Sequence, residues 1–299
     1  MQRGLLKGFQ LAKWIYKMSF PILAKLSPKL SSKLLFYKTF GKKLDLKNPK
    51  TFNEKLMWLK LNENDELKTK CTDKFLVRKY ISKLGYGHLL IDLCNVYENI
   101  EDIIFEELPE KFVMKCTHGS GFNIICKNKS GLDQSKTISL LSKWMKTDFS
   151  LLNAEPHYSK IQRRILVEKF LEGNEGQLPI DYKLHCFHGE AKFIELIVDR
   201  ETGLKSIMLN CDWQVLPYTE HSIKLEEKLK KPEKFEEMIA IAEELSKAFS
   251  YVRVDLYYTD KIYFGELTFT PSACLETVIS EEADYQIGQL LDLSKSTLL

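Results

Sequence analysis

The chain has 299 residues, of which 44% are hydrophobic and 28% charged, as is typical of a soluble globular protein rather than a disordered or fibrous one. Its seven cysteines are scattered, with no CxxC pair, and its six histidines show no metal-binding spacing. This favours a reducing compartment and argues against a disulfide framework or a zinc site.

The net charge of +3 hides a basic segment at the N-terminus. Residues 1–50 carry twelve Lys or Arg and one acid, Asp45, so this segment has a charge of +11 and the rest of the chain −8. Basic residues confined to one terminal segment do not form a nucleic-acid groove, so we expect no nucleic-acid partner.

Residues 1–20 predict a basic amphipathic helix, with Arg3, Lys7, Lys13 and Lys17 on one arc. Such a helix suits an anionic membrane surface, and no uncharged run is long enough to span a bilayer. The alternative is a helix packed on the protein body with its lysines outward. The residues leave both open, and we expect a separate N-terminal segment over 1–45.

Residues 46–110 predict a mainly helical region. Thr51 and Glu54 form a capping-box signature before an amphipathic helix. Thr72 or Asp73 can begin another helix, which ends at Gly85. Strand-like segments follow near residues 89–96 and 112–116.

A glycine-bearing loop follows the strand that carries Lys115. Its residues are His118, Gly119, Ser120 and Gly121. Such a loop can bring backbone N–H groups close to phosphate, and Lys115 would add a point charge. It is not a Walker A loop, because no GxxxxGK[ST] motif is present. An ordinary hairpin turn before a second strand at 123–126 is the alternative.

The segment ILVEKFL, which begins at Ile165, predicts a strand that follows a charged helix at about 133–145. The edge of this strand could offer backbone groups to an adenine, with Glu168 accepting from its amino group. The alternative is an exposed ion pair between Glu168 and Lys169. A hairpin then follows, on which Asp181 and Lys183 share one face.

The last predicted hairpin carries acids where a buried hairpin should be apolar. If its turn is centred on residues 260 and 261, Asp255 lies opposite Glu266 and Arg253 opposite Thr268. Carboxylates about 5 Å apart are destabilising unless a cation lies between them, and Mg²⁺ is held by a few carboxylates together with substrate phosphates. A three-residue loop would break this register. A sheet surface with scattered charges is the alternative.

Taken in order, these pieces resemble the TupA-like ATP-grasp family of bacterial surface-polysaccharide clusters, over about residues 40 to 295. The stretches that carry the resemblance are PKTFNEKLMWLKL, FVMKCTHGSGFNIICK, DYKLHCFHGE, VRVDLY and FGELTFTP. It implies an α+β, ATP-grasp fold in which two α+β subdomains clasp ATP. We expect one subdomain with the flap over 111–165, and one with the adenine and metal sites over 166–299.

The resemblance also implies roles for individual residues. ATP binding falls to Lys74, Lys115, His118, Gly119, Ser120, Gly121, Glu168, Lys169, Phe170, Leu171 and Lys183. The implied Mg²⁺ ligands are Asp255, Glu266 and Thr268, and the implied catalytic residues are Arg253 and Lys115. Many ATP-grasp ligases have Asn at the position of Thr268, and a hydroxyl is a poorer metal ligand, so the second metal position is in doubt.

The implied activity is that of an ATP-dependent carboxylate–amine ligase that forms an amide through an acyl phosphate. The expected partners are ATP, Mg²⁺, a carboxylate such as a uronic acid or an amino acid on a glycan, and an amine donor. We expect a cytoplasmic protein, peripheral on the inner membrane face through its N-terminal helix. The rivals are a kinase of the same fold, a glycosyltransferase and a non-catalytic scaffold.

Overall fold

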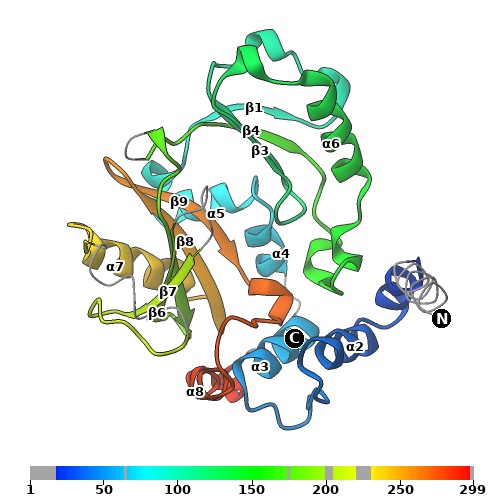
Figure 1. The fold of residues 1–299 in the computed structure, drawn as a ribbon, viewed down its shortest axis with the longest axis vertical. Helices are drawn as coiled ribbons and strands as arrows, with labels where there is room; N and C mark the ends of the chain where they lie inside the picture. The colour runs from blue at the N-terminus through cyan, green and yellow to red at the C-terminus, as the bar shows by residue number, and fades with distance from the viewer. Residues whose placement is uncertain (1–17, 64–65, 174–175, 199–204, 220–229, 297–299) are drawn as a thin grey trace, which may run out of the picture.

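The computed structural model describes residues 18–63, 66–173, 176–198, 205–219 and 230–296. Most of the predicted basic helix of residues 1–20 lies outside the described residues. The described chain forms two antiparallel sheets with helices packed around them, so the α+β class predicted from the sequence is confirmed (Figure 1). None of the helices in the described ranges is long and apolar enough to cross a bilayer.

The smaller sheet has four strands. Its spatial order is β1 (Leu93–Tyr97), β4 (Ile165–Lys169), β2 (Phe112–Cys116) and β3 (Asn123–Cys126). Helix α6 (Gln134–Lys146), capped by Asp133, packs its Leu141 into the core on one face of this sheet. The domain boundary expected near residue 165 falls at the start of β4, which pairs with β1 and β2, and the subdomain limits stay a prediction.

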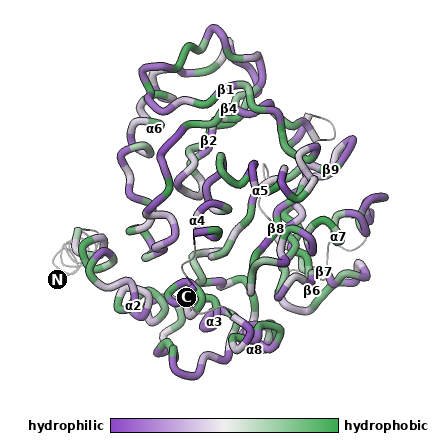
Figure 2. Tube along the Cα trace, turned by 180° about the vertical axis from the view of Figure 1, so that it is seen from behind, coloured by the Kyte–Doolittle hydropathy of each residue, from purple (hydrophilic) through white to green (hydrophobic). Residues whose placement is uncertain are grey.

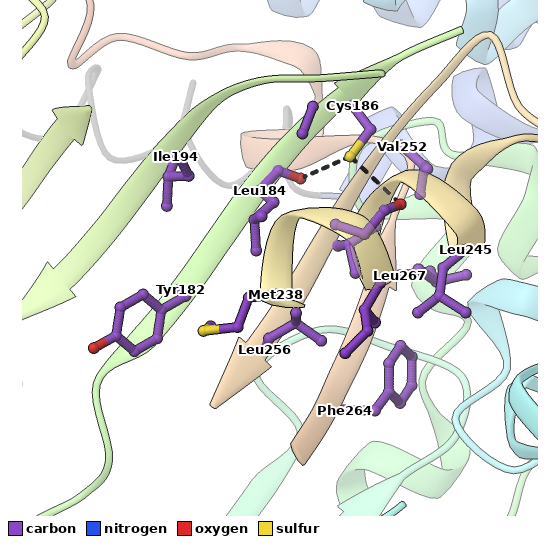
Figure 3. Packing of buried hydrophobic residues seen from close by; sticks show 14 of the residues in the cluster. Tyr182, Leu184, Cys186, Ile194, Met238, Leu245, Val252, Leu256, Phe264 and Leu267 are labelled. Carbon is purple, nitrogen blue, oxygen red and sulfur yellow. Dashed lines mark hydrogen bonds between the residues drawn. The ribbon is translucent and has the colours of Figure 1, made fainter. Parts of the chain in front are cut away.

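The larger sheet has five strands. Its spatial order is β7 (Lys205–Asn210), β6 (Glu190–Val198), β5 (Asp181–Phe187), β8 (Tyr251–Tyr258) and β9 (Ile262–Thr268). Helix α7 (Phe235–Ser246) covers one face and buries the main core with it (Figure 3). Within this core the Cys186 thiol lies 3.7 Å from the carbonyl oxygens of Leu184 and Ala242.

Helices α2 (Pro28–Phe40), α3 (Phe52–Asn62) and α8 (Glu281–Gln289) form a layer at one end of this sheet (Figure 1). The predicted capping box begins α3, because the Thr51 hydroxyl accepts from the Glu54 amide and the Glu54 carboxylate accepts from the Thr51 amide. A Cβ at Gly288 would lie 2.3 Å from the Lys50 carbonyl oxygen. Only glycine therefore lets α8 lie this close to the start of α3.

Two short helices, α4 (Glu66–Thr72) and α5 (Val77–Lys83), lie between the sheets (Figure 1). The Asp73 carboxylate accepts hydrogen bonds from the amides of Phe75 and Leu76 and so caps the turn that leads into α5. The helix start predicted at Thr72 or Asp73 is wrong by about one turn, because Thr72 ends α4 and α5 begins only at Val77, after this turn. Lys74 lies in this turn.

Candidate active site

Strand alternation divides the larger sheet into an apolar and a polar face. Leu184 and Val254 point into the core beneath α7. Lys183 and Asp255, the next residues along β5 and β8, face the other way and are paired across the two strands. The polar face therefore looks toward the smaller sheet and forms the floor of a cleft.

The predicted pairing of β8 with β9 is confirmed where the acids lie. Asp255 is opposite Glu266, and Arg253 is opposite Thr268. The turn differs from the prediction, because β8 ends at Tyr258 and β9 begins at Ile262, which leaves a three-residue loop.

A β-bulge at Gly265 restores the register that the longer loop would have broken. Between loop and bulge, Leu256 pairs with Phe264, one residue out of the predicted register. A Cβ at Gly265 would lie 2.9 Å from the Asp255 carbonyl oxygen. A glycine therefore lets the bulge form, and the bulge turns Glu266 to face Asp255.

The cleft between the sheets has a cavity volume of about 190 Å³. This is below the roughly 300–1,000 Å³ of most small-molecule pockets, and ion pairs reach across it. The residues that line it are Lys74, Arg78, Lys115, Ser120, Gly121, Phe122, Asn123, Glu168, Asp181, Lys183, Asp255, Tyr257, Phe264, Gly265 and Glu266. Eight of them are among the predicted site residues.

Asp255 is the centre of a buried charge network. Both of its carboxylate oxygens accept from the Arg253 guanidinium at 2.7 Å, and Lys183 donates to one of them at 2.9 Å. Lys183 also lies 2.9 Å from Asp181. Burial alone would lower the pKa of Lys183, but Asp255, aided by Asp181, raises it, so this lysine is charged at neutral pH.

Glu266 sits at the more open side of this network. Its carboxylate lies 3.5 Å from Lys74 and 3.6 Å from Arg253. Burial would raise its pKa, but Lys74, then Arg253 and Lys183, outweigh this effect and lower the pKa to about 2. The Thr268 hydroxyl donates to Glu266 at 3.0 Å and accepts from Arg253 at 3.2 Å. Both hydrogen bonds occupy the Thr268 hydroxyl in this structure. Its role as a metal ligand stays a prediction.

Lys115 and Glu168 meet across the smaller sheet, where β2 and β4 pair. The Lys115 ammonium lies 2.6 Å from the Glu168 carboxylate. Arg78, on α5, lies 3.5 Å from the same carboxylate and donates to the Ile91 carbonyl oxygen at 2.8 Å. The predicted phosphate contact and the predicted adenine contact are thus each other's partners in this structure.

The glycine-bearing loop is tied to the opposite wall through Lys74, which donates to the Gly119 carbonyl oxygen at 2.9 Å and also reaches Glu266. A Cβ at Gly119 would lie 2.8 Å from the rings of Phe122 and Phe149, so the loop packs tightly against aromatic side chains. Ser120 and Gly121 line the cleft, and their role as a flap over ATP stays a prediction.

Seven predicted residues are not part of the cleft lining: Gly119, Arg253 and Thr268, whose contacts are given above, and His118, Lys169, Phe170 and Leu171. His118 is buried, with Nε2 3.0 Å from the Trp144 carbonyl oxygen, and burial lowers its pKa. The Lys169 side chain is exposed and pairs with Asp92 at 3.0 Å. Phe170 and Leu171 follow β4 in irregular, half-buried backbone. Their assignment to ATP stays a prediction.

Arg78 and Asp181 are the charged residues of the cleft that the predicted set did not include. A signal existed for Arg78, because it follows Lys74 by four residues in a segment expected to be helical. Strand alternation predicts that Asp181 shares a face with Lys183. Nothing in the sequence pattern indicated that Asp181 would line a binding site.

A strained turn follows β9 directly. Ser272, Ala273 and Cys274 have φ of 47°, 57° and 65°, in the left-handed region that costs roughly 1–2 kcal/mol per residue. The Thr270 hydroxyl donates to the buried Glu155 at 2.6 Å, which holds the start of this turn. Strain kept in place by such contacts next to a charged cleft is a feature of functional sites.

The donor set at the cleft floor suits Mg²⁺. Asp255 and Glu266 offer hard oxygen ligands from facing positions, and Mg²⁺ commonly takes one or two carboxylates and completes its shell with water and substrate phosphates. Lys74, Arg253 and Lys183 offset the charge of these carboxylates here.

The family model for TupA-like ATPgrasp proteins matches residues 54–292, about four-fifths of the chain. The chain belongs to this TupA-like ATP-grasp family. The ATP-grasp fold predicted from the sequence is thereby confirmed. No curated protein matches the chain.

The chain also matches several solved structures, each under 25% identical to it. D-alanine–D-alanine ligase from Bacillus anthracis in complex with ATP is 20% identical, with a TM-score of 0.39 over 67% of this chain and 53% of that one. A second structure of that ligase is 16% identical, with a TM-score of 0.44 over 74% and 63%. Carboxyaminoimidazole ribonucleotide synthase from Aspergillus clavatus with ATP is 12% identical, with a TM-score of 0.39 over 67% and 45%. The chain thus spans about half to two-thirds of their lengths.

Proposed function

We propose that this protein is an ATP-dependent carboxylate–amine ligase. The observation that carries the proposal is one cleft lined both by lysines from three separate segments, Lys74, Lys115 and Lys183, and by the facing carboxylates Asp255 and Glu266. Membership of the ATP-grasp family supports the same reaction class. The substrate we propose is a carboxylate of a cell-surface polysaccharide or its lipid-linked precursor, from the setting that the family resemblance implies.

The lysines would bind the triphosphate, and Arg253 would act where the acyl phosphate forms. A substrate carboxylate oxygen attacks the γ-phosphorus and ADP leaves. The amine nitrogen then attacks the acyl carbon, phosphate leaves, and the nitrogen loses a proton. Positively charged donors fixed before the reaction stabilise the charge that develops on the transferred phosphoryl group. Arg253 is positioned for this by its two hydrogen bonds to Asp255.

Mg²⁺ held by Asp255 and Glu266 would neutralise phosphate charge and orient the triphosphate. The chain's own residues supply the remaining parts. Lys74 joins the flap to the metal-binding strand, so flap position and phosphate binding are coupled through one side chain. The Ser120–Gly121 segment would close over the phosphates and limit the access of water.

Calorimetry of ATP binding tests the proposal, with Glu266→Gln as the variant. With Mg²⁺, we expect the variant to bind ATP at least about tenfold more weakly, because a charge-assisted ligand is lost. With EDTA, we expect it to bind as tightly as wild type or more tightly, because the carboxylate repels the triphosphate when no metal lies between them. Glu195→Gln is the matched control, since Glu195 also has a pKa lowered to about 2 but does not line the cleft.

Equal weakening of ATP binding with and without Mg²⁺ would show that Glu266 is not a metal ligand. No ATP binding by wild type would refute the nucleotide site altogether. If ATP binds, uronic acids with amino acids are screened for ADP release. A product whose mass reflects loss of water on condensation supports the ligase, and a phosphorylated product would identify a kinase instead.

A further inference from the structure

The N-terminal arm, residues 18–40, lies at the edge of the molecule, away from the larger sheet (Figure 1). Residues 18–26 are helical, and after Ser27 the helix α2 continues to Phe40. Seen from behind, the arm lies beside α3 (Figure 2). It is held to the protein by Phe20, Ala24 and Leu35, which pack with Ala154, and by Phe36, which packs into the core around α3.

The other face of the arm carries a row of exposed apolar side chains, here called the arm stripe. Its members are Met18, Ile22, Leu26, Leu30, Leu34 and Tyr37. Within each helix their spacing of three or four residues places them on one side. They are half of all the large hydrophobic side chains that are exposed in the described ranges, gathered within 20 residues, and Leu26 is 78% exposed. Such a concentration marks an interaction surface.

A second row, of lysines, runs along the stripe. Lys25, Lys29 and Lys33 are exposed, and each directly precedes a stripe leucine in sequence. No acidic residue occurs before Asp45. The arm therefore presents apolar side chains beside a continuous positive edge.

We propose that the arm stripe and its lysines dock on the surface of an anionic phospholipid bilayer. The apolar row would enter the interfacial region, and Lys25, Lys29 and Lys33 would contact lipid headgroups. Charge complementarity favours this occupant over two others. A second copy would bring two positive edges together, and residues 1–17, with four basic and no acidic residues, would meet the same repulsion. The inference does not depend on the ligase chemistry, but it would bring the cleft to a lipid-linked substrate.

Vesicle co-sedimentation of the full chain tests the docking surface. Phosphatidylcholine vesicles with and without phosphatidylglycerol are compared at low and high salt. The test variant is Leu26→Gln/Leu30→Gln. Its matched control is Ile104→Gln/Val278→Gln, which removes two exposed apolar side chains elsewhere. A third variant, Lys25→Gln/Lys29→Gln/Lys33→Gln, removes the charge. Circular dichroism and ATP binding check that each variant is folded, independently of vesicle binding.

We expect wild type and control to pellet with phosphatidylglycerol vesicles, and the leucine variant to bind at least tenfold more weakly at both salt concentrations. The lysine variant should lose about fivefold per lysine at low salt and little at high salt. Wild type that stays in the supernatant would overturn the proposal, and so would a leucine variant that pellets as the control does. A wild-type dimer that the leucine substitutions convert to monomer would instead assign the stripe to a second copy.

Discussion

Neutralising Glu266 is expected to destabilise the nucleotide-free protein in a pH-dependent way. The pKa of Glu266 is lowered from 4.5 to about 2, because Lys74, Arg253 and Lys183 outweigh the cost of burial. A shift of that size corresponds to at most about 3 kcal/mol. Because the side chain is 33% exposed, water and salt screen its contacts, and we expect about 1 kcal/mol for Glu266→Gln at pH 7.

The direction of the pH dependence follows from the difference in the pKa of Glu266 between the folded and the unfolded protein. A carboxylate whose pKa is lowered on folding stabilises the folded state above its unfolded pKa and loses this contribution as the pH falls toward the folded value. Urea denaturation of wild type and Glu266→Gln from pH 7 to pH 3 measures the contribution of Glu266 to the free energy of unfolding. The difference between the two should be constant above about pH 5 and shrink by more than half by about pH 3. The substitution Glu282→Gln, of an exposed residue on α8, should stay within about 0.5 kcal/mol of wild type. A variant as stable as wild type at pH 7, or a difference that does not change with pH, would refute the reasoning.

Three further substitutions test the backbone and buried contacts around the cleft. Gly119→Ala should weaken ATP binding in calorimetry, because its methyl group would lie 2.8 Å from two phenylalanine rings and displace the flap; unchanged affinity would contradict this packing. Gly265→Ala should abolish the Mg²⁺ dependence of ATP binding with an unchanged circular dichroism spectrum, since its Cβ would lie 2.9 Å from the Asp255 carbonyl oxygen; retained Mg²⁺ dependence would show that the bulge tolerates a side chain. Thr270→Val should lower the free energy of unfolding by about 1–3 kcal/mol in urea titrations, because it removes the 2.6 Å hydrogen bond to buried Glu155; stability equal to wild type would mean that Glu155 finds another partner.

Strand alternation and helix capping carried most of the fold prediction. Alternation along β5 and β8 put Lys183 and Asp255 on one face, and the capping box at Thr51 began a helix where expected. Asp73 instead caps a turn, and α5 begins four residues later, at Val77. These signals are local, since each depends on residues within a few positions of one another. The order of such pieces along the chain then pointed to the family.

The hairpin of β8 and β9 shows a feature that the local sequence pattern did not predict correctly. The pairing of Asp255 with Glu266 was predicted from a two-residue turn, but the loop has three residues and the bulge at Gly265 compensates for the extra one. The pairing was thus right although the turn was wrong. A glycine inside a strand is a signal for a β-bulge. A prediction that combined a bulge at Gly265 with a three-residue loop would have had both the turn and the pairing right.

Partners within the smaller sheet and its covering helix could not be read from the sequence, because they depend on which segments the fold places side by side. Lys115 and Glu168 were assigned separately to phosphate and adenine, yet the fold brings them within 2.6 Å. His118 shares its loop with the cleft residues Ser120 and Gly121, but its Nε2 lies 3.0 Å from the Trp144 carbonyl oxygen on α6 instead. Backbone proximity in a loop does not fix which way a side chain points.

The described cleft is electrostatically self-compensated, and this has a consequence for how ATP would bind. Each lysine proposed to bind phosphate already has a carboxylate partner: Lys115 has Glu168, Lys74 has Glu266, and Lys183 has Asp255. Triphosphate binding would therefore exchange partners rather than strip water from isolated cations, which avoids the large cost of burying unpaired charge.

The carboxylates released in that exchange are the groups with predicted roles toward the same ligand. Glu168, freed from Lys115, could accept from the adenine amino group. Glu266, freed from Lys74, could join Asp255 in binding Mg²⁺. Because Lys74 also donates to Gly119, its transfer to phosphate would release the flap from its present contact. One ligand would then rearrange the adenine, metal and flap regions together, which links the three parts of the site through ion pairs that the structure already contains.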